Sequence, residues 1–432
     1  MVIKRDFYLD KLRASMGNGL VKVITGIRRC GKSFLLFDLF VEELRARGVD
    51  DEHIIAIQLD DDDNIELRVP RKLSAWIKAR LPKDGKPTYV LIDEIQECRP
   101  TEEEKKDLRT CVTFYDVLNS LMKKADVYVT GSNSEMLSKD VATNFRDRGD
   151  VIQVWPLSFA ECYTVGGQDK SEAWDSYLTW GGMPLAFVNA DERRRAAYLD
   201  SLFDQVYFKD IIERYNLSDD GYVLGNLVDV LASGIGSLTN PTRLAVAMSN
   251  EKSVAVSAPT LGSYIDHLQD SFLFNKAERW DVKGKRYLAY PSKYYMVDPG
   301  LRNARLNFRQ IEKSHLMENV IYNDLVRRGY RVDVGVVETV GKDKDGKSVK
   351  KRTEIDFVVN AGTRKLYIQS AFEMPNEEKR DQESYSLRHT GDFFKKIIIV
   401  NGTDRPHNDE NGILNIGVIP FLLEPEFLSG LF

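Results

Sequence analysis

The sequence predicts an α/β fold with a doubly wound parallel sheet, and three observations lead to that prediction. A β-branched run ends at Gly26, and an apolar helical pattern begins just after Ser33. An apolar strand over residues 89–92 delivers two consecutive acids at its carboxyl end. Strand-like and helix-like segments alternate from the first of these features onward, as in parallel sheets that carry helices on both faces.

The elements of this sheet follow one another regularly along the chain. A short amphipathic helix within residues 1–19 precedes the first strand, and four consecutive acids at 60–63 are expected to form a solvated loop. The further elements expected are a helix over 34–48, a strand over 53–59, a helix over 69–81, a charged insertion over 101–109, a helix over 112–124, and strands over 126–133 and 151–154.

Composition limits the kind of protein this is. A chain of 432 residues with 43% hydrophobic and 29% charged residues is typical of a globular protein of about two to four domains. A net charge of −5 argues against a surface built throughout for DNA or anionic membrane. The four cysteines lack Cys-x-x-Cys spacing, which argues against zinc and disulfide scaffolds and favours a reducing cytoplasm. The sequence contains no apolar run long enough to span a membrane and no apolar signal segment, so we expect no membrane partner.

The segment Gly26–Ser33 reads Gly-Ile-Arg-Arg-Cys-Gly-Lys-Ser and matches the G-x-x-x-x-G-K-S phosphate loop between a strand and a helix. Its glycines let successive N–H groups point at phosphate oxygens, and the following helix adds the positive end of its dipole. Lys32 is expected to reach the β- and γ-phosphates of ATP, and Ser33 to ligate Mg²⁺. The residues expected to bind the nucleotide are Gly26, Ile27, Arg28, Arg29, Cys30, Gly31, Lys32, Ser33 and Phe34.

The acid pair Asp93-Glu94 is the second motif that carries chemistry. An Asp at the end of a buried strand, downstream of a phosphate loop, is placed to hold the Mg²⁺ shell together with Ser33. The adjacent Glu94 is placed to polarise the attacking water as a general base. We therefore expect Asp93 to be a metal residue and Glu94 a catalytic one.

Two further catalytic candidates follow the strand over 126–133. Asn133, or its neighbour Ser132, would orient the lytic water or sense the γ-phosphate, and the alternative is a helix cap. Arg148, or Arg146, would act as an arginine finger within the chain or on a neighbouring subunit, and the alternative is an ordinary surface arginine.

The chain beyond residue 160 is expected to form two regions before its C-terminal part. Residues 161–220 are mainly helical and would form a lid or linker. Residues 221–305 contain three helical segments and two strand-like runs, over 272–279 and 287–295, which suggests a winged helix. Its third helix, over 259–269, would enter a major groove of DNA or dock a protein, and this helix contains no Lys or Arg.

Residues 306–432 are expected to form an α/β domain. A helix over 314–328 precedes strands over 330–338, 354–359, 365–371, 396–400 and 413–418, with a lysine-rich hairpin tip over 342–352. Asp356 on one strand, followed by a Glu-x-Lys-like triplet on the next, is the pattern of restriction-endonuclease-like metal sites. Glu318 would add a ligand, but Gln369 and Ala371 stand where an acid and a lysine are needed. We therefore expect a nuclease-like fold that is catalytically degenerate.

Over nearly its whole length the chain resembles bacterial and archaeal AAA-type ATPases that carry a C-terminal domain of unknown function. The resemblance rests on the phosphate loop, Leu91–Gln96, Thr130–Asn133, Pro156–Phe159, Gly181–Pro184, Tyr294–Arg302, His315–Asn319 and Glu354–Phe357. It implies ATP binding, ATP hydrolysis and a nuclease-like C-terminal fold. The family's usual Gly-Arg before the fifth strand is Asp147-Arg148 here, which leaves the finger assignment open.

These inferences lead to one main functional hypothesis and two alternatives. The main hypothesis is a cytoplasmic AAA-type ATPase that uses ATP and Mg²⁺ as a switch or motor to reposition its C-terminal domains. The alternatives are an ATP-gated protein that binds duplex DNA with little hydrolysis, and a Mg²⁺-dependent nuclease that uses Asp356. A protein partner, or further copies of this chain, would complete the assembly.

Overall fold

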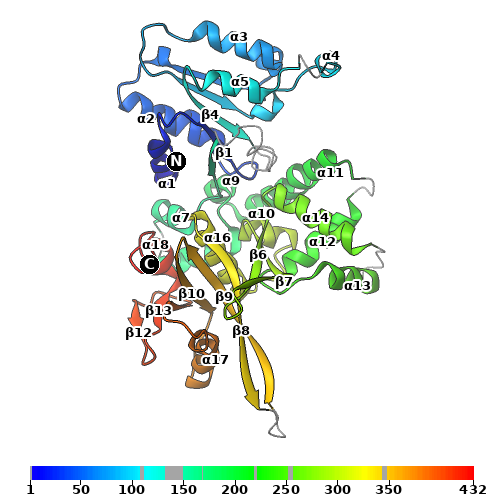
Figure 1. Ribbon diagram of the computed structural model, residues 1–432, viewed down its shortest axis with the longest axis vertical. Coiled ribbons are helices and arrows are strands. Elements are labelled where there is room, and N and C mark those ends of the chain that lie inside the picture. The colour runs from blue at the N-terminus through cyan, green and yellow to red at the C-terminus, as the bar shows by residue number, and fades with distance from the viewer. Residues whose placement is uncertain are drawn as a thin grey trace. The chain divides into compact units, whose positions relative to one another are not determined.

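The computed structural model describes residues 2–107, 111–131, 149–167, 169–217, 221–251, 256–342 and 348–432 (Figure 1). The chain divides into two compact units, which are described separately below. Unit 1 comprises Met1–Pro156 and Asp270–Phe272, and unit 2 comprises Leu157–Gln269 and Leu273–Phe432. The finer division into four domains, with boundaries after residues 160, 220 and 305, stays a prediction.

Unit 1 is built on a sheet of five parallel strands in the order β2-β3-β4-β1-β5. The strands are β1 (Val21–Thr25), β2 (Ile54–Gln58), β3 (Tyr89–Asp93), β4 (Asp126–Gly131) and β5 (Gly149–Gln153). Because all five run in the same direction, their carboxyl ends share one edge of the sheet. The predicted parallel sheet is confirmed, and β1 lies between β4 and β5.

Helices cover both faces of this sheet. On one face, Val127 and Val129 of β4 share a core with side chains of α3 (Pro70–Arg80) and α5 (Phe114–Leu121). On the other face, the Tyr128 ring packs against Phe40 with 4.8 Å between centroids. The remaining helical segments of unit 1 are α1 (Asp6–Ser15), η1 (Phe34–Phe40), α2 (Val41–Ala46), η2 (Asp51–His53), η3 (Asp62–Arg68), η4 (Ile95–Glu97) and α4 (Glu102–Lys105).

The helix expected over 34–48 differs from its prediction. Its first seven residues, η1, form a π-helical stretch that continues into α2 and ends at Ala46. The apolar side chains still face inward, since Leu35, Leu36 and Leu39 are buried. Sequence periodicity locates the buried face but does not distinguish a π-helix from an α-helix, because the two differ in residues per turn by less than the pattern resolves.

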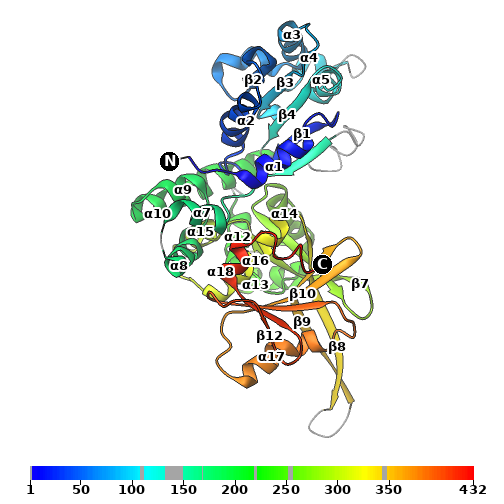
Figure 2. The same cartoon turned by 90° about the vertical axis from the view of Figure 1, so that its left-hand side faces the viewer.

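Unit 2 contains a mixed sheet of eight strands in the order β12-β13-β11-β10-β9-β8-β6-β7. Figure 2 labels β7, β8, β9, β10 and β12 of this sheet. The strands are β6 (Phe274–Asp281), β7 (Arg286–Met296), β8 (Arg331–Lys342), β9 (Ser348–Ala361), β10 (Arg364–Ala371), β11 (Lys395–Val400), β12 (His407–Asn408) and β13 (Leu414–Gly417). β9 runs antiparallel to β8 and β10, and β11 runs parallel to β10. β8 and β9 extend into the lysine-rich segment that was expected to be a hairpin tip, so most of its described residues are strand.

Helices surround this sheet and make up the first part of unit 2. They are α7 (Phe159–Gly166), α8 (Lys170–Trp180), α9 (Pro184–Val188), α10 (Glu192–Ser201), η6 (Leu202–Phe208), α11 (Lys209–Tyr215), α12 (Tyr222–Ser233), α13 (Pro241–Glu251), α14 (Ala258–Asp270), α15 (Pro299–Arg305), α16 (Lys313–Arg327), α17 (Glu377–Arg388) and α18 (Val418–Leu423). Within the described parts of the chain, no helix is both long and apolar enough to cross a membrane.

The region interpreted as a winged helix has the expected elements in the expected order. Its three helices are α12, α13 and α14, and its hairpin is the antiparallel pair β6 and β7. β6 also pairs in parallel with β8, so the hairpin is continuous with the eight-stranded sheet. The winged-helix interpretation therefore stays a prediction.

Two glycine motifs of unit 2 form a closely packed junction. A Cβ added at Gly182 would lie 1.9 Å from the Leu157 carbonyl oxygen, and one at Gly300 would lie 2.0 Å from the Trp180 carbonyl oxygen. The Gly182 N–H donates to Asp298 at 2.6 Å. Burial raises the pKa of Asp298 to about 6, against the lowering effect of backbone N–H donors. These motif residues therefore fix the packing of α8, α9 and α15.

Candidate active site

The phosphate loop follows β1 and bends back at the carboxyl edge of the sheet in unit 1. Gly26 has a φ of 139°, and a Cβ there would lie 2.1 Å from the Val154 carbonyl oxygen. Gly31 has a φ of 97°, a conformation that side chains disfavour. Both glycines are therefore required by the backbone path, which turns the loop toward the start of η1. The predicted phosphate-loop residues thus form a tight turn between β1 and η1, and their binding of a nucleotide stays a prediction.

Lys32 lies inside this loop. Its side chain is 4% exposed, and its ammonium donates hydrogen bonds to the carbonyl oxygens of Gly26 and Ile27, at 3.0 and 3.2 Å. These carbonyls hold the charged group within the loop's concave side. A buried ammonium satisfied by neutral carbonyls alone retains an unneutralised charge, which an anionic phosphate would neutralise. The loop chemistry thus fits a phosphate.

Asp93 lies at the end of β3 and contacts the phosphate loop directly. Its carboxylate is 2% exposed and accepts a hydrogen bond from the Thr130 hydroxyl, and the Ser33 hydroxyl lies near enough to lower its pKa. Burial raises the pKa of Asp93, while the two hydroxyl donors lower it and the nearby Glu94 raises it further. The two residues expected to hold Mg²⁺, Ser33 and Asp93, are therefore in contact. Their oxygen donors suit a hard divalent cation.

Glu94 begins the turn after β3 in a left-handed conformation, with φ of 47°. Its backbone N–H donates to the Thr130 hydroxyl oxygen at 3.0 Å, and its carboxylate accepts a hydrogen bond from Gln96. Non-glycine residues in this backbone region are uncommon and occur often at functional sites. Because of this conformation, the Glu94 side chain points in a different direction from the one it would have if β3 continued.

Thr130 is a site residue that the sequence did not single out. Its hydroxyl donates to Asp93 and accepts from the Glu94 N–H, so one β4 side chain holds both members of the acid pair. Thr130 lies in the motif Thr130–Asn133, but a threonine within an apolar strand reads as an ordinary strand residue. The register of β3 against β4 would have been needed to find it.

Arg5 is a second residue that sequence reasoning missed. It is 3% exposed, and its guanidinium donates to the Cys30 carbonyl oxygen at 3.1 Å and to the Trp155 carbonyl oxygen at 2.8 Å. Its guanidinium also lies 4.6 Å from the Tyr8 ring centroid, and the Tyr8 hydroxyl accepts from the Trp155 N–H. Arg5 thus ties the phosphate loop to the segment after β5.

A second polar cluster lies in unit 2, around the ammonium of Lys293 on β7. The ammonium lies 2.8 Å from Glu318 on α16, and 2.7 Å from Glu354 and 3.2 Å from Asp356 on β9. The Tyr295 hydroxyl donates to Glu318 at 2.7 Å, and the Ser370 N–H donates to Asp356 at 2.9 Å. Lys293 itself is 3% exposed. The predicted acids Glu318 and Asp356 are thus brought together, but around an internal cation.

The electrostatics of this cluster follow from burial and close charges. Burial raises the pKa of Glu318 to about 7, with Lys293 lowering it and Asp356 raising it. The pKa of Lys293 lies well above its usual value, because three carboxylates outweigh its desolvation. Gln369 does not join the cluster, since its amide donates to Glu383 at 3.3 Å, and Ala371 is a buried core residue.

Comparison with known proteins shows the family to which the chain belongs. Residues 18–163 match the family model described as AAA domain, and residues 171–312 match a domain of unknown function (DUF8612). An uncharacterized protein of Haemophilus influenzae is 31% identical over 428 residues, which is 98% of this chain and 99% of the relative. The chain belongs to the family of this Haemophilus protein. It carries an AAA-type ATPase domain in its first third.

The comparisons also found more distant similarities. An uncharacterized protein of Methanocaldococcus jannaschii is 25% identical over 382 residues, 84% of this chain and 77% of the relative. The solved Walker-type ATPase of Pyrococcus abyssi is 14% identical with a TM-score of 0.47, covering 71% of this chain and 96% of that one. The Orc1 protein of Aeropyrum pernix in complex with DNA is 13% identical with a TM-score of 0.27, covering 71% and 93%.

The remaining predicted residues of the AAA domain are placed as follows. Arg28 and Arg29 form the outer turn of the loop, where Arg29 has a φ of 65°. The Cys30 thiol is fully buried and lies 3.4 Å from the Val154 carbonyl oxygen, and burial raises its pKa. Phe34 is 39% exposed at the start of η1. Ser132, Asn133, Arg146 and Arg148 lie outside the described residues, so their roles stay predictions.

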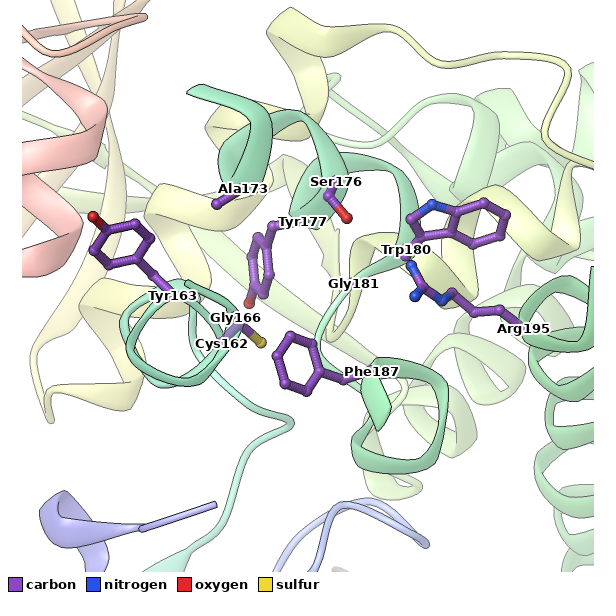
Figure 3. Close-up of a pocket in the computed structure, with 10 residues that line it drawn as sticks. All are labelled: Cys162, Tyr163, Gly166, Ala173, Ser176, Tyr177, Trp180, Gly181, Phe187 and Arg195. Carbon is purple, nitrogen blue, oxygen red and sulfur yellow. The ribbon is translucent and has the colours of Figure 1, made fainter. Parts of the chain in front are cut away.

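A small cavity in unit 2 does not extend the site. It lies between α7, α8 and α9 and is lined by Tyr177, Trp180, Phe187 and Arg195 among others (Figure 3). Arg195 donates to a backbone carbonyl and lies 5.1 Å from the Trp180 ring centroid. The cavity measures about 30 Å³, which is about one water's share of liquid volume, so it cannot admit a nucleotide.

Proposed function

We propose that the AAA domain binds Mg-ATP and hydrolyses it to ADP and phosphate. The observation that carries this proposal is the contact between Ser33 of the phosphate loop and Asp93 at the end of β3. It joins the two motifs at one edge of the sheet, next to the buried Lys32 ammonium. Three groups with separate roles in phosphoryl transfer thereby lie together.

In this proposal the loop amides and Lys32 bind the phosphates, and Ser33 and Asp93 hold Mg²⁺. The metal would neutralise charge that develops on the phosphate oxygens. Glu94 accepts the proton of the attacking water as general base. Thr130 positions both acids from β4. Asn133 and Arg148 would complete the site as γ-phosphate sensor and arginine finger.

The proposal is tested by phosphate release from the purified full chain in the presence of Mg-ATP. Lys32→Ala should lose both nucleotide binding and turnover, because it removes the charge that pairs with the phosphates. Glu94→Gln should bind ATP normally and lose turnover by roughly 100-fold or more, since it removes only the general base.

Glu97→Gln is the matched control for Glu94→Gln. It neutralises another carboxyl of the same turn, on η4, three residues further along. Turnover of this variant should equal that of the wild type. If turnover is unchanged in both Lys32→Ala and Glu94→Gln, the proposed site is not where hydrolysis takes place.

The nuclease alternative receives less support from the site geometry. An ammonium lies among the three carboxylates that would have to ligate Mg²⁺, and Gln369 and Ala371 supply neither a further acid nor a lysine on β10. We therefore expect plasmid DNA incubated with Mg²⁺ or Mn²⁺ to remain uncut. Cleavage that disappears in Asp356→Ala would reverse this conclusion.

The role as a switch or motor, and a duplex-DNA partner, are further proposals that rest on the sequence hypothesis. A DNA partner would require binding that weakens steeply with salt, because phosphate contacts release counterions. A rise of ATPase rate with protein concentration would indicate that subunits complete one another's sites. Absence of DNA binding at low salt would remove the DNA alternative.

A further inference from the structure

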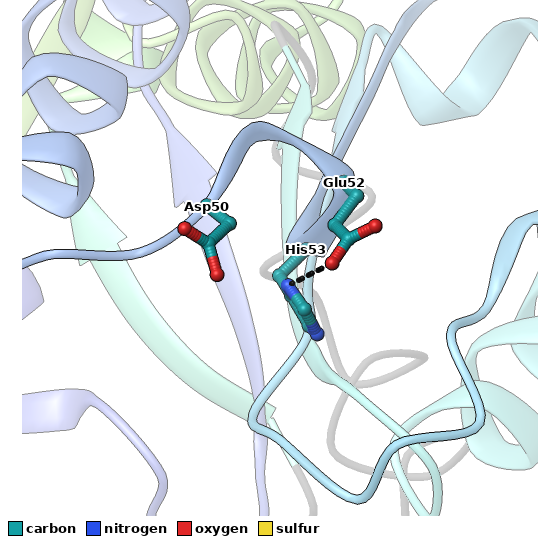
Figure 4. Close-up of side chains that lie close together, drawn as sticks. All are labelled: Asp50, Glu52 and His53. Carbon is teal, nitrogen blue, oxygen red and sulfur yellow. Dashed lines mark ion pairs between the residues drawn. The ribbon is translucent and has the colours of Figure 1, made fainter.

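Three side chains with metal-binding chemistry gather at a turn that the proposed ATPase mechanism does not use. In the part of the chain that the structure describes, Asp50, Glu52 and His53 have ligand atoms that all lie within 4.8 Å of one another (Figure 4). They lie in and just before η2, which leads from α2 into β2. The Asp50 carbonyl oxygen accepts from the His53 N–H at 2.9 Å, so the turn is closed by its own backbone.

His53 is the member of this group that needs an explanation. It is 1% exposed, and its Nε2 lies 3.1 and 3.2 Å from the two carboxylate oxygens of Asp84. Among the residues that the structure describes, its Nδ1 has no hydrogen-bond partner, and the Glu52 carboxylate lies 3.8 Å away, beyond hydrogen-bond range. A buried imidazole nitrogen without a partner carries a desolvation cost.

The Asp84 contact determines which nitrogen of the neutral ring is available. A carboxylate is an acceptor, so Asp84 selects the tautomer with hydrogen on Nε2, and the Nδ1 lone pair then faces Glu52 and Asp50. Asp84 is itself held by the Lys86 N–H at 3.1 Å, and its pKa is lowered, mainly by the hydrogen bond from His53. A carboxylate behind a histidine ring is the usual second partner of a metal-bound imidazole.

We propose that Asp50, Glu52 and the Nδ1 of His53 form a binding site for a first-row divalent transition-metal ion such as Zn²⁺, with Asp84 as positioning residue. One imidazole and two carboxylates suit Zn²⁺, which would leave a position for water. Mg²⁺ prefers oxygen ligands in octahedral geometry and would compete poorly. Ligand bonds of about 2.0–2.2 Å require the exposed side chains of Asp50 and Glu52 to rotate inward.

The site is separate from the proposed nucleotide site in the fold of unit 1. His53 directly precedes the first residue of β2, and Ile54 there pairs with Tyr89, the first residue of β3. The phosphate loop follows the last residue of β1. In a parallel sheet the amino ends of β2 and β3 and the carboxyl end of β1 lie at opposite edges. The metal would therefore join the turn before β2 to the loop before β3, and it would not contact the nucleotide.

One neighbouring group competes with the metal. The Lys86 ammonium lies 3.0 Å from one carboxylate oxygen of Asp50, and both side chains are 59% exposed. An exposed ion pair of this kind is worth little and is readily exchanged. Its removal is therefore a direct test, since Lys86→Met should strengthen metal binding without altering any ligand.

The experiment is calorimetric titration of Zn²⁺ into the chelator-treated full chain in the presence of excess Mg²⁺. We expect one ion per chain. His53→Gln and Glu52→Gln should weaken binding more than tenfold, Asp84→Asn should weaken it by about 10- to 100-fold, and Lys86→Met should tighten it. His407→Gln, which alters an exposed histidine on β12, should bind as the wild type does.

Two further measurements distinguish the loss of a metal ligand from misfolding of a variant. Glu52 is 70% exposed, so Glu52→Gln should keep the wild-type thermal midpoint without metal and lose its rise with Zn²⁺. Co²⁺ should give a visible absorption band in the wild type that His53→Gln lacks. Equal Zn²⁺ affinity in the wild type, His53→Gln and Glu52→Gln, or an absence of saturable binding in the wild type, would overturn the proposal.

Discussion

At the scale of single residues, the acid pair after β3 depends on a threonine from the neighbouring strand. Thr130 donates to the Asp93 carboxylate and accepts from the Glu94 N–H. Asp93 is nearly fully buried, so the orientation of its oxygens toward Ser33 is set by these contacts and not by solvent. Positioning by such hydrogen bonds is a general requirement for placing a metal and a base within reach of one phosphate.

Thr130→Val should therefore impair catalysis more than it impairs folding. It keeps the side-chain shape but leaves the Glu94 N–H unpaired, at a cost of about 1–3 kcal/mol in the free energy of unfolding. We expect kcat to fall at least tenfold and the half-saturating Mg²⁺ concentration to rise. Steady-state phosphate release measured across a Mg²⁺ series checks both.

Thr25→Val is the control for this substitution. Thr25 is fully buried at the end of β1, and its hydroxyl has no hydrogen-bond partner within the described part of the chain. Its replacement should leave the free energy of unfolding unchanged or slightly higher and kcat within about twofold. Equal loss of kcat in both variants would show that Thr130 has no special role.

Lys293 in unit 2 is the cation at the centre of a cluster of three carboxylates. Removing one partner of a buried charge network leaves the others uncompensated, which costs about 3–5 kcal/mol. Lys293→Met should therefore lower the urea midpoint of unfolding substantially, because Glu318, Glu354 and Asp356 lose their common counterion. Urea unfolding at pH 8, above the pKa of about 7 of Glu318, measures this most directly.

Lys276→Met provides the comparison for Lys293→Met. Lys276 lies on β6 with a 26% exposed side chain, and it forms an ion pair with the half-exposed Glu278. Its loss should change the free energy of unfolding by less than about 1 kcal/mol. A Lys293→Met effect no larger than this would mean that the cluster is solvated and carries little energy.

At the scale of elements, the glycine junction of unit 2 gives a structural role to two sequence motifs that contain no predicted catalytic or binding residue, Gly181–Pro184 and Tyr294–Arg302. Gly181 and Gly182 follow the end of α8. The Gly182 N–H donates to Asp298, and the absence of a Cβ at Gly181 and Gly182 lets Asp298 and Leu157 approach. Asn303 of α15 donates to two carbonyl oxygens at the end of α8, both at 2.9 Å. The sequence marks this place as a turn, but a turn signal does not say which distant segment packs on it.

Gly182→Ala should destabilise the protein by several kcal/mol. The new Cβ would lie 1.9 Å from the Leu157 carbonyl oxygen, and backbone atoms on both sides must shift to accept it. Thermal unfolding of the full chain should show a clearly lower midpoint. A midpoint equal to that of the wild type would mean that the junction is loosely packed.

Gly262→Ala is the matched control for that prediction. Gly262 lies inside α14, and a Cβ there would meet nothing within 4 Å. Alanine is favoured over glycine in a helix interior by about 1 kcal/mol, so this variant should be slightly more stable than the wild type. The two substitutions are chemically identical, and only their surroundings differ.

At the scale of the whole molecule, the sequence predicted the strands and the sheet arrangement that follow from local residue patterns. The strand before Gly26, the buried strand that ends at Asp93 and the parallel arrangement between them follow from short apolar runs and glycine positions. They are confirmed by the five-stranded parallel sheet and the AAA domain match. The five strands expected in the C-terminal part were also found in that order, because each has an apolar run of its own, whereas α17, α18 and the two-residue β12 were not predicted.

What the sequence could not predict depends on contacts between distant segments. Arg5 reaches Trp155, which is 150 positions away, and Lys293 reaches Asp356, which is 63 positions away. No local periodicity encodes such pairs, and Arg5 and Lys293, each taken alone, look like ordinary surface charges. The π-helical start of η1 was missed for a different reason, since it alters helical geometry without altering which residues are buried.

The central claim is that Ser33 and Asp93 hold one magnesium ion beside the phosphates that Lys32 binds. Calorimetric titration of ATP into the wild type and Asp93→Asn, each with and without Mg²⁺, tests it most directly. We expect the wild type to bind ATP at least tenfold more tightly with Mg²⁺, and Asp93→Asn to bind equally in both conditions at the Mg²⁺-free affinity. A full Mg²⁺-dependent gain in Asp93→Asn would contradict the account.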